Sequence, residues 1–239
     1  MTYDKGTFTE HLEELRSRLI KCIIAILIAF LCSYYFSEDL FALLSYPLNK
    51  VLPEESKLIF TGLTDAFFTY FKVALIFGIF LSSPVILYQI YMFITPGLYA
   101  NEKKYLIPFV FFSSILFIGG ALFGYLVIFP IGFKFFLSFA TDEITALPSI
   151  KEYLTFSSKL LFSFGIIFEL PLFTFFLTKL GLINYEQLSK NRRYAILLIF
   201  VSSAILTPPD VVTQILMSGP LLILFEISVI ITRIFGKKQ

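Results

Sequence analysis

Acidic side chains in basic or apolar surroundings are the residues of this chain best suited to bind a charged partner. Near the N-terminus, Glu10, Glu13 and Glu14 stand just before Arg16 and Arg18. On a helix, an acid and a base three or four residues apart, such as Glu14 and Arg18, form an ion pair along the surface. The alternative is that one of these carboxylates remains available for a cationic partner. The spacing alone leaves both interpretations open.

A second isolated acid, Glu102, lies in a short polar segment that follows Pro96 and Gly97. These two residues end the preceding apolar stretch, so Glu102 stands at the beginning of the next predicted helix. An acid is favoured there by the positive end of the helix dipole. The position of Glu102 therefore does not by itself require a binding role.

Glu169 is the third acid of interest, because it lies in the middle of the apolar stretch between Lys159 and Lys179. A charged side chain at that depth in a membrane is costly and is by default a candidate for function. Pro171, two residues later, predicts a kink. We expect Glu169 to face a polar concavity within a helix bundle rather than lipid. The alternative is a protonated glutamate that is hydrogen-bonded inside the bundle.

The composition indicates a membrane protein. Of the 239 residues, 57% are hydrophobic and only 15% are charged, whereas about 25% of the residues of soluble domains are charged. One histidine and two cysteines are too few for a zinc or haem cluster, and no nucleotide-binding loop or nucleophile elbow is present. We expect no enzymatic activity, no cofactor or metal, and no nucleic-acid partner.

Charged residues divide the chain into apolar stretches that predict an all-α, polytopic fold with six transmembrane helices, some kinked and some short. Residues 1–239 are expected to form a single six-span membrane domain, which opens with a cytoplasmic helix at residues 1–21. The predicted spans are approximately 18–37, 66–95, 105–130, 158–178, 194–207 and 212–232.

Basic residues fix the predicted orientation, because lysine and arginine collect on the cytoplasmic side of membrane proteins. With six spans, thirteen of the nineteen basic residues fall on the side that holds both termini. Both termini are therefore expected inside, and the long loops 38–65 and 134–159 outside. Within the first loop we expect short helices and turns, with Pro47 and Pro53 as breaks.

Several segments, in chain order, are similar to the signatures of one known family. They are His11–Leu19; Ser83–Gln89 with Phe93, Pro96, Leu98, Tyr99 and Glu102; Phe129 and Pro130; Phe164, Gly165, Phe168, Glu169 and Pro171; and Leu206–Asp210. The chain thereby resembles TatC, the multispanning subunit of the twin-arginine protein translocase, over nearly its whole length. It departs from the family where Lys103 and Lys104 replace a frequent pair of arginines, and where Tyr91 replaces a frequent tryptophan.

The resemblance implies a receptor in the bacterial cytoplasmic (inner) membrane for signal peptides of folded precursor proteins that carry two consecutive arginines. It assigns recognition of the arginine pair to Glu14 and Glu102, and it implies that the proton-motive force drives export. The chemistry agrees with this assignment, because a guanidinium pairs bidentately with a carboxylate in a geometry that lysine cannot reproduce. Implied partners are the single-span subunits TatA and TatB, the lipid bilayer and further copies of the chain.

The outer ends of the last two spans are a predicted docking site for a TatA or TatB helix. Only sixteen residues separate Arg193 from Asp210, which as a helix give about 24 Å against a hydrocarbon core of about 30 Å. Pro209 and Asp210 belong to the tight turn that follows, and Gln214 lies one turn into the last span, where its amide needs a hydrogen-bond partner. Alternatively, Gln214 only reaches the outer interface or a neighbouring loop.

Two other classes of function remain open from the residues alone. A proton- or solute-coupled transporter built around Glu169 requires further titratable groups in the spans, and only Glu226 and Lys72 are available. A structural assembly factor without a substrate is the other class. Capture of the protein by a twin-arginine peptide, with a twin-lysine peptide as control, distinguishes these from a signal-peptide receptor.

Overall fold

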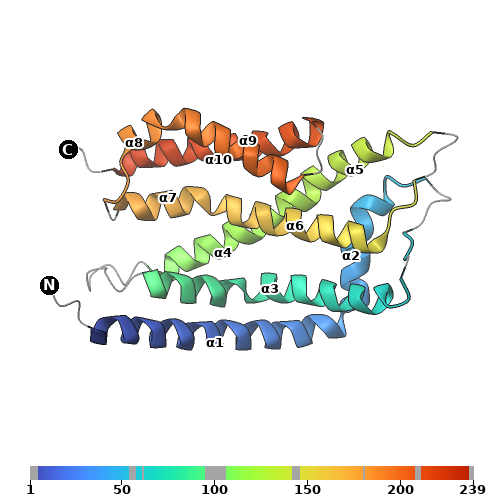
Figure 1. The fold of residues 1–239 in the computed structure, drawn as a ribbon, viewed down its shortest axis with the longest axis horizontal. Coiled ribbons are helices and arrows are strands. Elements are labelled where there is room, and N and C mark those ends of the chain that lie inside the picture. Colours follow the sequence, from blue (N-terminus) through green and yellow to red (C-terminus); the bar gives the residue numbers. More distant parts are fainter. Residues whose placement is uncertain are drawn as a thin grey trace. The chain divides into compact units, whose positions relative to one another are not determined.

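The computed structural model of the chain is all-α (Figure 1), and it describes residues 5–53, 58–60, 62–94, 106–141, 146–179, 181–207 and 211–236. In these ranges Ile59 and Ser149 form an isolated β-bridge. The helices are α1 (Lys5–Tyr35), α2 (Ser37–Asn49), α3 (Asp65–Ile94), α4 (Leu106–Phe123), the π-helical turn η3 (Gly124–Ile128), α5 (Phe129–Leu137), α6 (Ile150–Phe168), α7 (Leu170–Lys179), α8 (Tyr185–Lys190), α9 (Arg192–Leu206) and α10 (Val211–Phe235).

Within the described residues, four helical runs are long and apolar enough to cross a membrane: Asp65–Phe93, Ile107–Leu137, Ile150–Lys179 and Val211–Phe235. A fifth candidate is the pair formed by α1 and α2, which are bent by 83° at Phe36. The fifth predicted span corresponds to α9, which has 15 residues and is therefore about 22 Å long. The expected shortness of this span is thus confirmed.

The contacts within the chain define two compact units, the first formed by residues 1–44 and 62–115. In this unit α1 and α3 lie side by side (Figure 1). Small side chains allow the approach: Ala29 and Ala74 are buried, and a Cβ on Gly78 would stand 3.0 Å from the backbone of Phe30. Because the backbones meet so closely, α1 and α3 are held in a fixed register.

The second unit, residues 45–61 and 116–239, is built around phenylalanine. Phe129 and Phe164 are fully buried. A Cβ on Gly120 would lie 2.8 Å from the Cβ of Phe168, and one on Gly165 would lie 2.8 Å from the Phe117 ring. Glycine at these two positions therefore lets the helical runs 106–137 and 150–179 pack closely.

Two helical runs extend further than the predicted spans. The third span was expected to end at residue 130, but α5 continues to Leu137, and α6 begins at Ile150 rather than near residue 158. Lys134, Lys151 and Lys159 are exposed on these helices and do not interrupt them, because a lysine is a good helix former whose charge needs only contact with water. The outer loop expected at residues 134–159 is correspondingly shorter.

The predicted prolines have different effects. Pro47 lies inside α2, which ends at Asn49, so the expected break at Pro47 is wrong. In the last turn of a helix, a proline removes only one hydrogen bond of the ladder. Before Pro130, the chain forms the π turn, in which the N–H of Phe129 donates to the carbonyl of Gly124. The helix thus continues through Pro130 without a sharp end.

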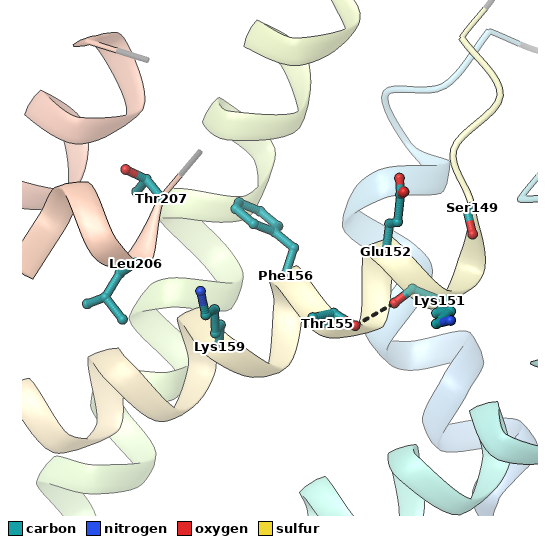
Figure 2. Close-up of a pocket in the computed structure, with 8 residues that line it drawn as sticks. All are labelled: Ser149, Lys151, Glu152, Thr155, Phe156, Lys159, Leu206 and Thr207. Atoms are coloured by element: carbon teal, nitrogen blue, oxygen red, sulfur yellow. Dashed lines mark hydrogen bonds between the residues drawn. The ribbon is translucent and has the colours of Figure 1, made fainter. Parts of the chain in front are cut away.

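The short helix α9 ends beside α6. The ammonium of Lys159 donates to the carbonyl oxygen of Ile205 at 3.4 Å, and Leu206 and Thr207 lie close to the same lysine (Figure 2). Lys159 thereby satisfies one of the carbonyl groups that the end of a helix leaves without a partner.

Candidate functional site

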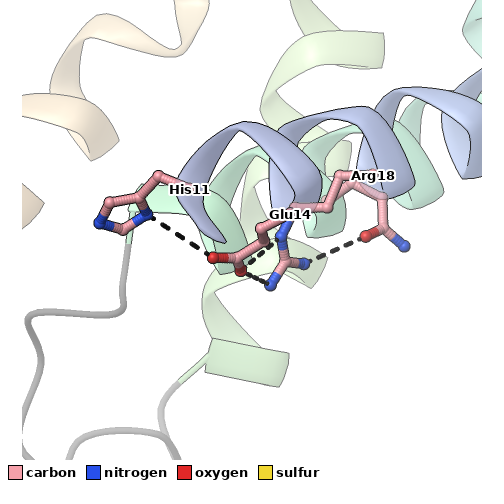
Figure 3. Close-up of polar contacts among 4 residues, drawn as sticks. His11, Glu14 and Arg18 are labelled. Carbon is pink, nitrogen blue, oxygen red and sulfur yellow. Dashed lines mark hydrogen bonds and ion pairs between the residues drawn. The ribbon is translucent and has the colours of Figure 1, made fainter. Parts of the chain in front are cut away.

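Glu14 and Arg18 form an ion pair one helical turn apart on α1 (Figure 3). The guanidinium of Arg18 donates from Nε to Oε1 of Glu14 at 2.9 Å, and its Nη2 donates to the same oxygen. The spacing expected from the sequence is therefore confirmed for this pair. Both side chains are partly shielded, with exposed fractions of 32% for Glu14 and 15% for Arg18.

Gln89 of α3 holds the other side of the Arg18 guanidinium. Its Oε1 accepts a hydrogen bond from Nη1 of Arg18 at 3.2 Å, and the amide side chain is buried. The antiparallel register of α1 and α3 explains this contact. Arg18 lies twelve residues before Phe30, and Gln89 lies eleven residues after Gly78, so the close approach at Phe30 and Gly78 brings the two polar groups together.

The second carboxylate oxygen of Glu14 faces a different direction. Its Oε2 is 3.9 Å from Nδ1 of His11 (Figure 3), too far for a hydrogen bond. Within the described part of the chain, Oε2 accepts no hydrogen bond. A cationic ligand can therefore pair with this oxygen while Arg18 keeps its contacts with Oε1. Because Arg18 cancels the charge of Glu14, a net attraction for two arginines requires at least one further acid.

Several predicted site residues lie outside the described residues: Glu102, Lys103, Lys104, Pro209 and Asp210. Their predicted roles stay predictions.

Glu169 occupies a single-residue break between α6 and α7. Its N–H donates to the carbonyl of Ile166, and its carbonyl accepts from the N–H of Phe173. The helix is thus interrupted by one residue, two positions before Pro171, and the bend expected from Pro171 stays a prediction. The side chain is half-buried, and its Oε1 atom is buried. Whether this carboxyl faces a polar concavity stays a prediction.

Gln214 of α10 donates from Nε2 to the carbonyl oxygen of Phe200 on α9 at 3.1 Å. The amide thus finds the hydrogen-bond partner that its depth in the span requires, and the partner is the backbone of the neighbouring helix. This contact ties the first turns of α10 to α9. The Oε1 of Gln214 is the acceptor that this bond leaves for other groups.

Glu226 of α10 forms an ion pair with Arg192 at the start of α9, with 3.0 Å between Oε2 and Nη2. About half of each side chain is exposed, so water and salt screen the pair. Glu226 is thereby engaged in a surface contact, which weakens its candidacy as a companion of Glu169 in a transport path. In the described residues, no group of three or more His, Cys, Asp or Glu side chains is arranged to hold a metal.

Sequence reasoning missed two of these contacts. Gln89 belongs to a quoted motif, but pairing across 71 positions depends on the register of two helices, which no local spacing gives. The Arg192–Glu226 pair also joins separate helices. No spacing within a single helix indicates this pair.

Comparisons with known proteins agree over nearly the whole chain. The sequence profile of the family described as "Sec-independent protein translocase protein (TatC)" matches residues 10–220. The TatC protein of Desulforapulum autotrophicum is 52% identical over 236 residues, covering 99% of this chain and 87% of that protein. The TatC protein of Escherichia coli (strain K12) is 41% identical over 235 residues, covering 98% and 91%.

Solved structures give the same result for the fold. A crystal structure described as that of the twin-arginine translocase receptor TatC matches with a TM-score of 0.83 at 43% identity, covering 94% of this chain and 98% of that one. A second, described as the same receptor in DDM, matches with a TM-score of 0.84 at 43% identity, covering 93% and 99%.

Proposed function

Because the chain belongs to the family of the Sec-independent protein translocase protein TatC, we propose that it binds signal peptides carrying two consecutive arginines. Glu14 supplies one of the two carboxylates for this pair, and Glu102 supplies the other. The chain is a membrane component of a protein translocase. Its contribution to export is recognition, without enzymatic chemistry.

The observation that carries this proposal is the arrangement around Glu14. Arg18 donates to Oε1 of Glu14, and Gln89 of α3 holds the same guanidinium from its other side, so the carboxylate is kept in one position. Oε2 remains the oxygen toward which a guanidinium of the ligand can donate. An arginine can make a parallel pair of N–H bonds with the two oxygens of a carboxylate, and a lysine of the same charge cannot. Glu14 offers the ligand Oε2 only, so Glu102 is the carboxylate proposed to accept this pair. The site thus favours arginine over lysine.

Capture of the purified, membrane-reconstituted protein on an immobilised twin-arginine peptide tests the function. We expect capture by the twin-arginine peptide and clearly weaker capture by the twin-lysine peptide. In precursor crosslinking, Glu14→Gln and Glu102→Gln are expected to reduce the yield while leaving membrane insertion intact. Unchanged crosslinking in both variants removes this site.

The proposed orientation places both termini and residue 103 at the cytoplasmic side, in the bacterial inner membrane. The family resemblance and the distribution of basic residues support it. Labelling of single cysteines introduced at positions 57 and 103 is expected to occur from opposite sides of the membrane. Labelling of both from the same side contradicts the orientation.

We further propose that the outer ends of α9 and α10 dock a helix of a TatA or TatB subunit, at Gln214, Pro209 and Asp210. The shortness of α9 supports this placement, and so does Oε1 of Gln214, for which the described residues supply no hydrogen bond. Scanning cysteine crosslinks between position 214 and the partner helix test it. Strong crosslinks at other positions and none at position 214 would place the docking surface elsewhere on the protein. Self-association of the chain belongs to the same proposal.

A further inference from the structure

A recess lies between the first turns of α6 and the end of α9, with a volume of about 520 Å³ (Figure 2). Its polar lining includes Lys151, Glu152 and Lys159, and its apolar lining includes Phe156 and Leu206. Neither the ion pair at Glu14 nor the break at Glu169 contributes to it. The recess is therefore a separate site.

The shortness of α9 creates this recess. The bond from Lys159 to the carbonyl of Ile205 places Lys159 level with the last turn of α9. The segment of α6 from Ile150 to Lys159 rises about 13 Å, and it projects beyond the end of α9, which stops at Leu206. The side of α6 that faces the recess is thus not covered by α9.

The basic side chains of the recess follow one face of α6. Lys151, Thr155 and Lys159 are four residues apart, so they stand above one another on the helix. Thr155 donates its hydroxyl to the carbonyl of Lys151 at 2.7 Å. The donors for a ligand are therefore the ammonium of Lys151 and the two N–H groups of Lys159 that its bond to Ile205 leaves. With Glu152 included, the charge of the lining is +1, which favours an anion.

An apolar stripe on α9 ends at Ile205, one residue before Leu206, which lines the recess. Leu198, Val201 and Ile205 are exposed by 63%, 48% and 67%, and spacings of three and four residues put them on one side of the helix. A ligand with a phosphate group at one end and hydrocarbon at the other matches the stripe and the lysines together. A water-soluble phosphate matches the lysines alone.

We propose that this recess binds the headgroup of an anionic phospholipid, with its phosphate between Lys151 and Lys159 and its acyl chains along the exposed stripe of α9. One net positive charge beside an anionic headgroup is worth about a fivefold gain in affinity. We therefore expect phosphatidylglycerol to be preferred about fivefold over zwitterionic phosphatidylcholine at this site.

The chain contains no tryptophan, so a single introduced indole reports on one place. Phe156→Trp puts it in the recess, and Leu206→Trp puts it on the opposite wall in case the first change disturbs packing. Ile166→Trp, at an exposed position further along α6, is the matched reporter outside the recess. Each protein is reconstituted in vesicles that contain brominated phosphatidylglycerol or brominated phosphatidylcholine, and quenching of the indole is measured.

The expected result is about fivefold preferential quenching by phosphatidylglycerol at positions 156 and 206, and equal quenching at position 166. The preference is expected to disappear in K151Q/K159Q and to persist in K50Q/K134Q, which loses the same charge elsewhere. Equal quenching by both lipids at positions 156 and 206 overturns the proposal, and so does a preference that survives K151Q/K159Q. Loss of the preference in inorganic phosphate, but not in chloride of equal ionic strength, assigns the recess to a soluble anion and also overturns it.

Discussion

Because Arg18 stands beside Glu14, removing both charges together is expected to have a moderate effect on peptide binding, and removing the Glu14 charge alone is expected to have a larger one. The perturbation is Glu14→Gln, made in the wild-type chain and again in an Arg18→Gln background. Both residues belong to α1, and their contact is direct. The pair therefore forms a compact double-mutant cycle, in which coupling between the two charges can be measured.

The magnitude follows from the charges around the ligand. With an effective dielectric constant of about 20, two unit charges 4 Å apart interact by about 4 kcal/mol. A guanidinium bound at Oε2 of Glu14 stands roughly 6 Å from the Arg18 guanidinium, whose repulsion is roughly 2.8 kcal/mol on the same scale. The net contribution of the Glu14–Arg18 pair is then about 1.4 kcal/mol, which corresponds to about a tenfold change in Kd.

The assay is the fluorescence anisotropy of a labelled twin-arginine peptide titrated with the protein in nanodiscs. E14Q/R18Q is expected to raise Kd about tenfold relative to wild type. E14Q alone is expected to raise Kd more, because Arg18 then repels the ligand without the opposing charge of Glu14, and R18Q alone is expected to lower Kd. Glu13→Gln is the matched control, because it removes the same charge from an exposed side chain at the neighbouring position. We expect it to change Kd less than twofold.

The comparison of E14Q with E14Q/R18Q is the critical result. If E14Q alone raises Kd no more than E14Q/R18Q does, then Arg18 does not oppose the ligand and the electrostatic account of the site is wrong. A twofold or smaller effect of E14Q in both backgrounds contradicts the assignment of Glu14 itself. Expression level and monodispersity of each variant identify losses that come from folding.

Three further predictions concern stability. Gly78→Val is expected to lower Tm and to weaken peptide binding, because its Cβ meets the backbone of α1 at 3.0 Å; normal Tm and binding would show that α1 and α3 separate freely. Gly120→Ala is expected to cost about 1–3 kcal/mol by overpacking against Phe168, and an unchanged denaturation midpoint contradicts this. A double-mutant cycle on the free energy of unfolding is expected to give a coupling energy below about 1 kcal/mol for Arg192 and Glu226. A larger coupling energy means that the pair is desolvated.

Sequence reasoning was reliable where a single helix determines the outcome. Residues 66–95 were expected to form one span, and α3 runs from Asp65 to Ile94. The pairing of Glu14 with Arg18 also depends on a spacing within one helix. A local pattern contains these answers because the residues that matter are at most one or two turns apart.

Reasoning from the sequence was weaker where charge was taken as a boundary. Lys134 and Lys151 were assigned to an outer loop, but they lie within α5 and α6. A lysine indicates contact with water and does not indicate the end of a helix. The length of a helix that projects beyond the apolar layer is therefore underestimated. Contacts between helices could not be predicted from the sequence for another reason. The bond of Gln89 to Arg18 depends on the glycine contact at Gly78, more than ten residues from either partner.

The π turn at Gly124–Ile128 has a consequence for the rotation of the helical run that contains it. A π turn accommodates one residue more than an α turn, and each residue of an α-helix corresponds to about 100° of rotation. Everything from Phe129 onward is therefore turned by about 100° relative to an uninterrupted helix. In this orientation Phe129 is fully buried, and the Phe133 ring lies 5.5 Å from that of Tyr153. Deleting one residue within the turn would swing both phenylalanines away from these neighbours while leaving the composition of the span almost unchanged.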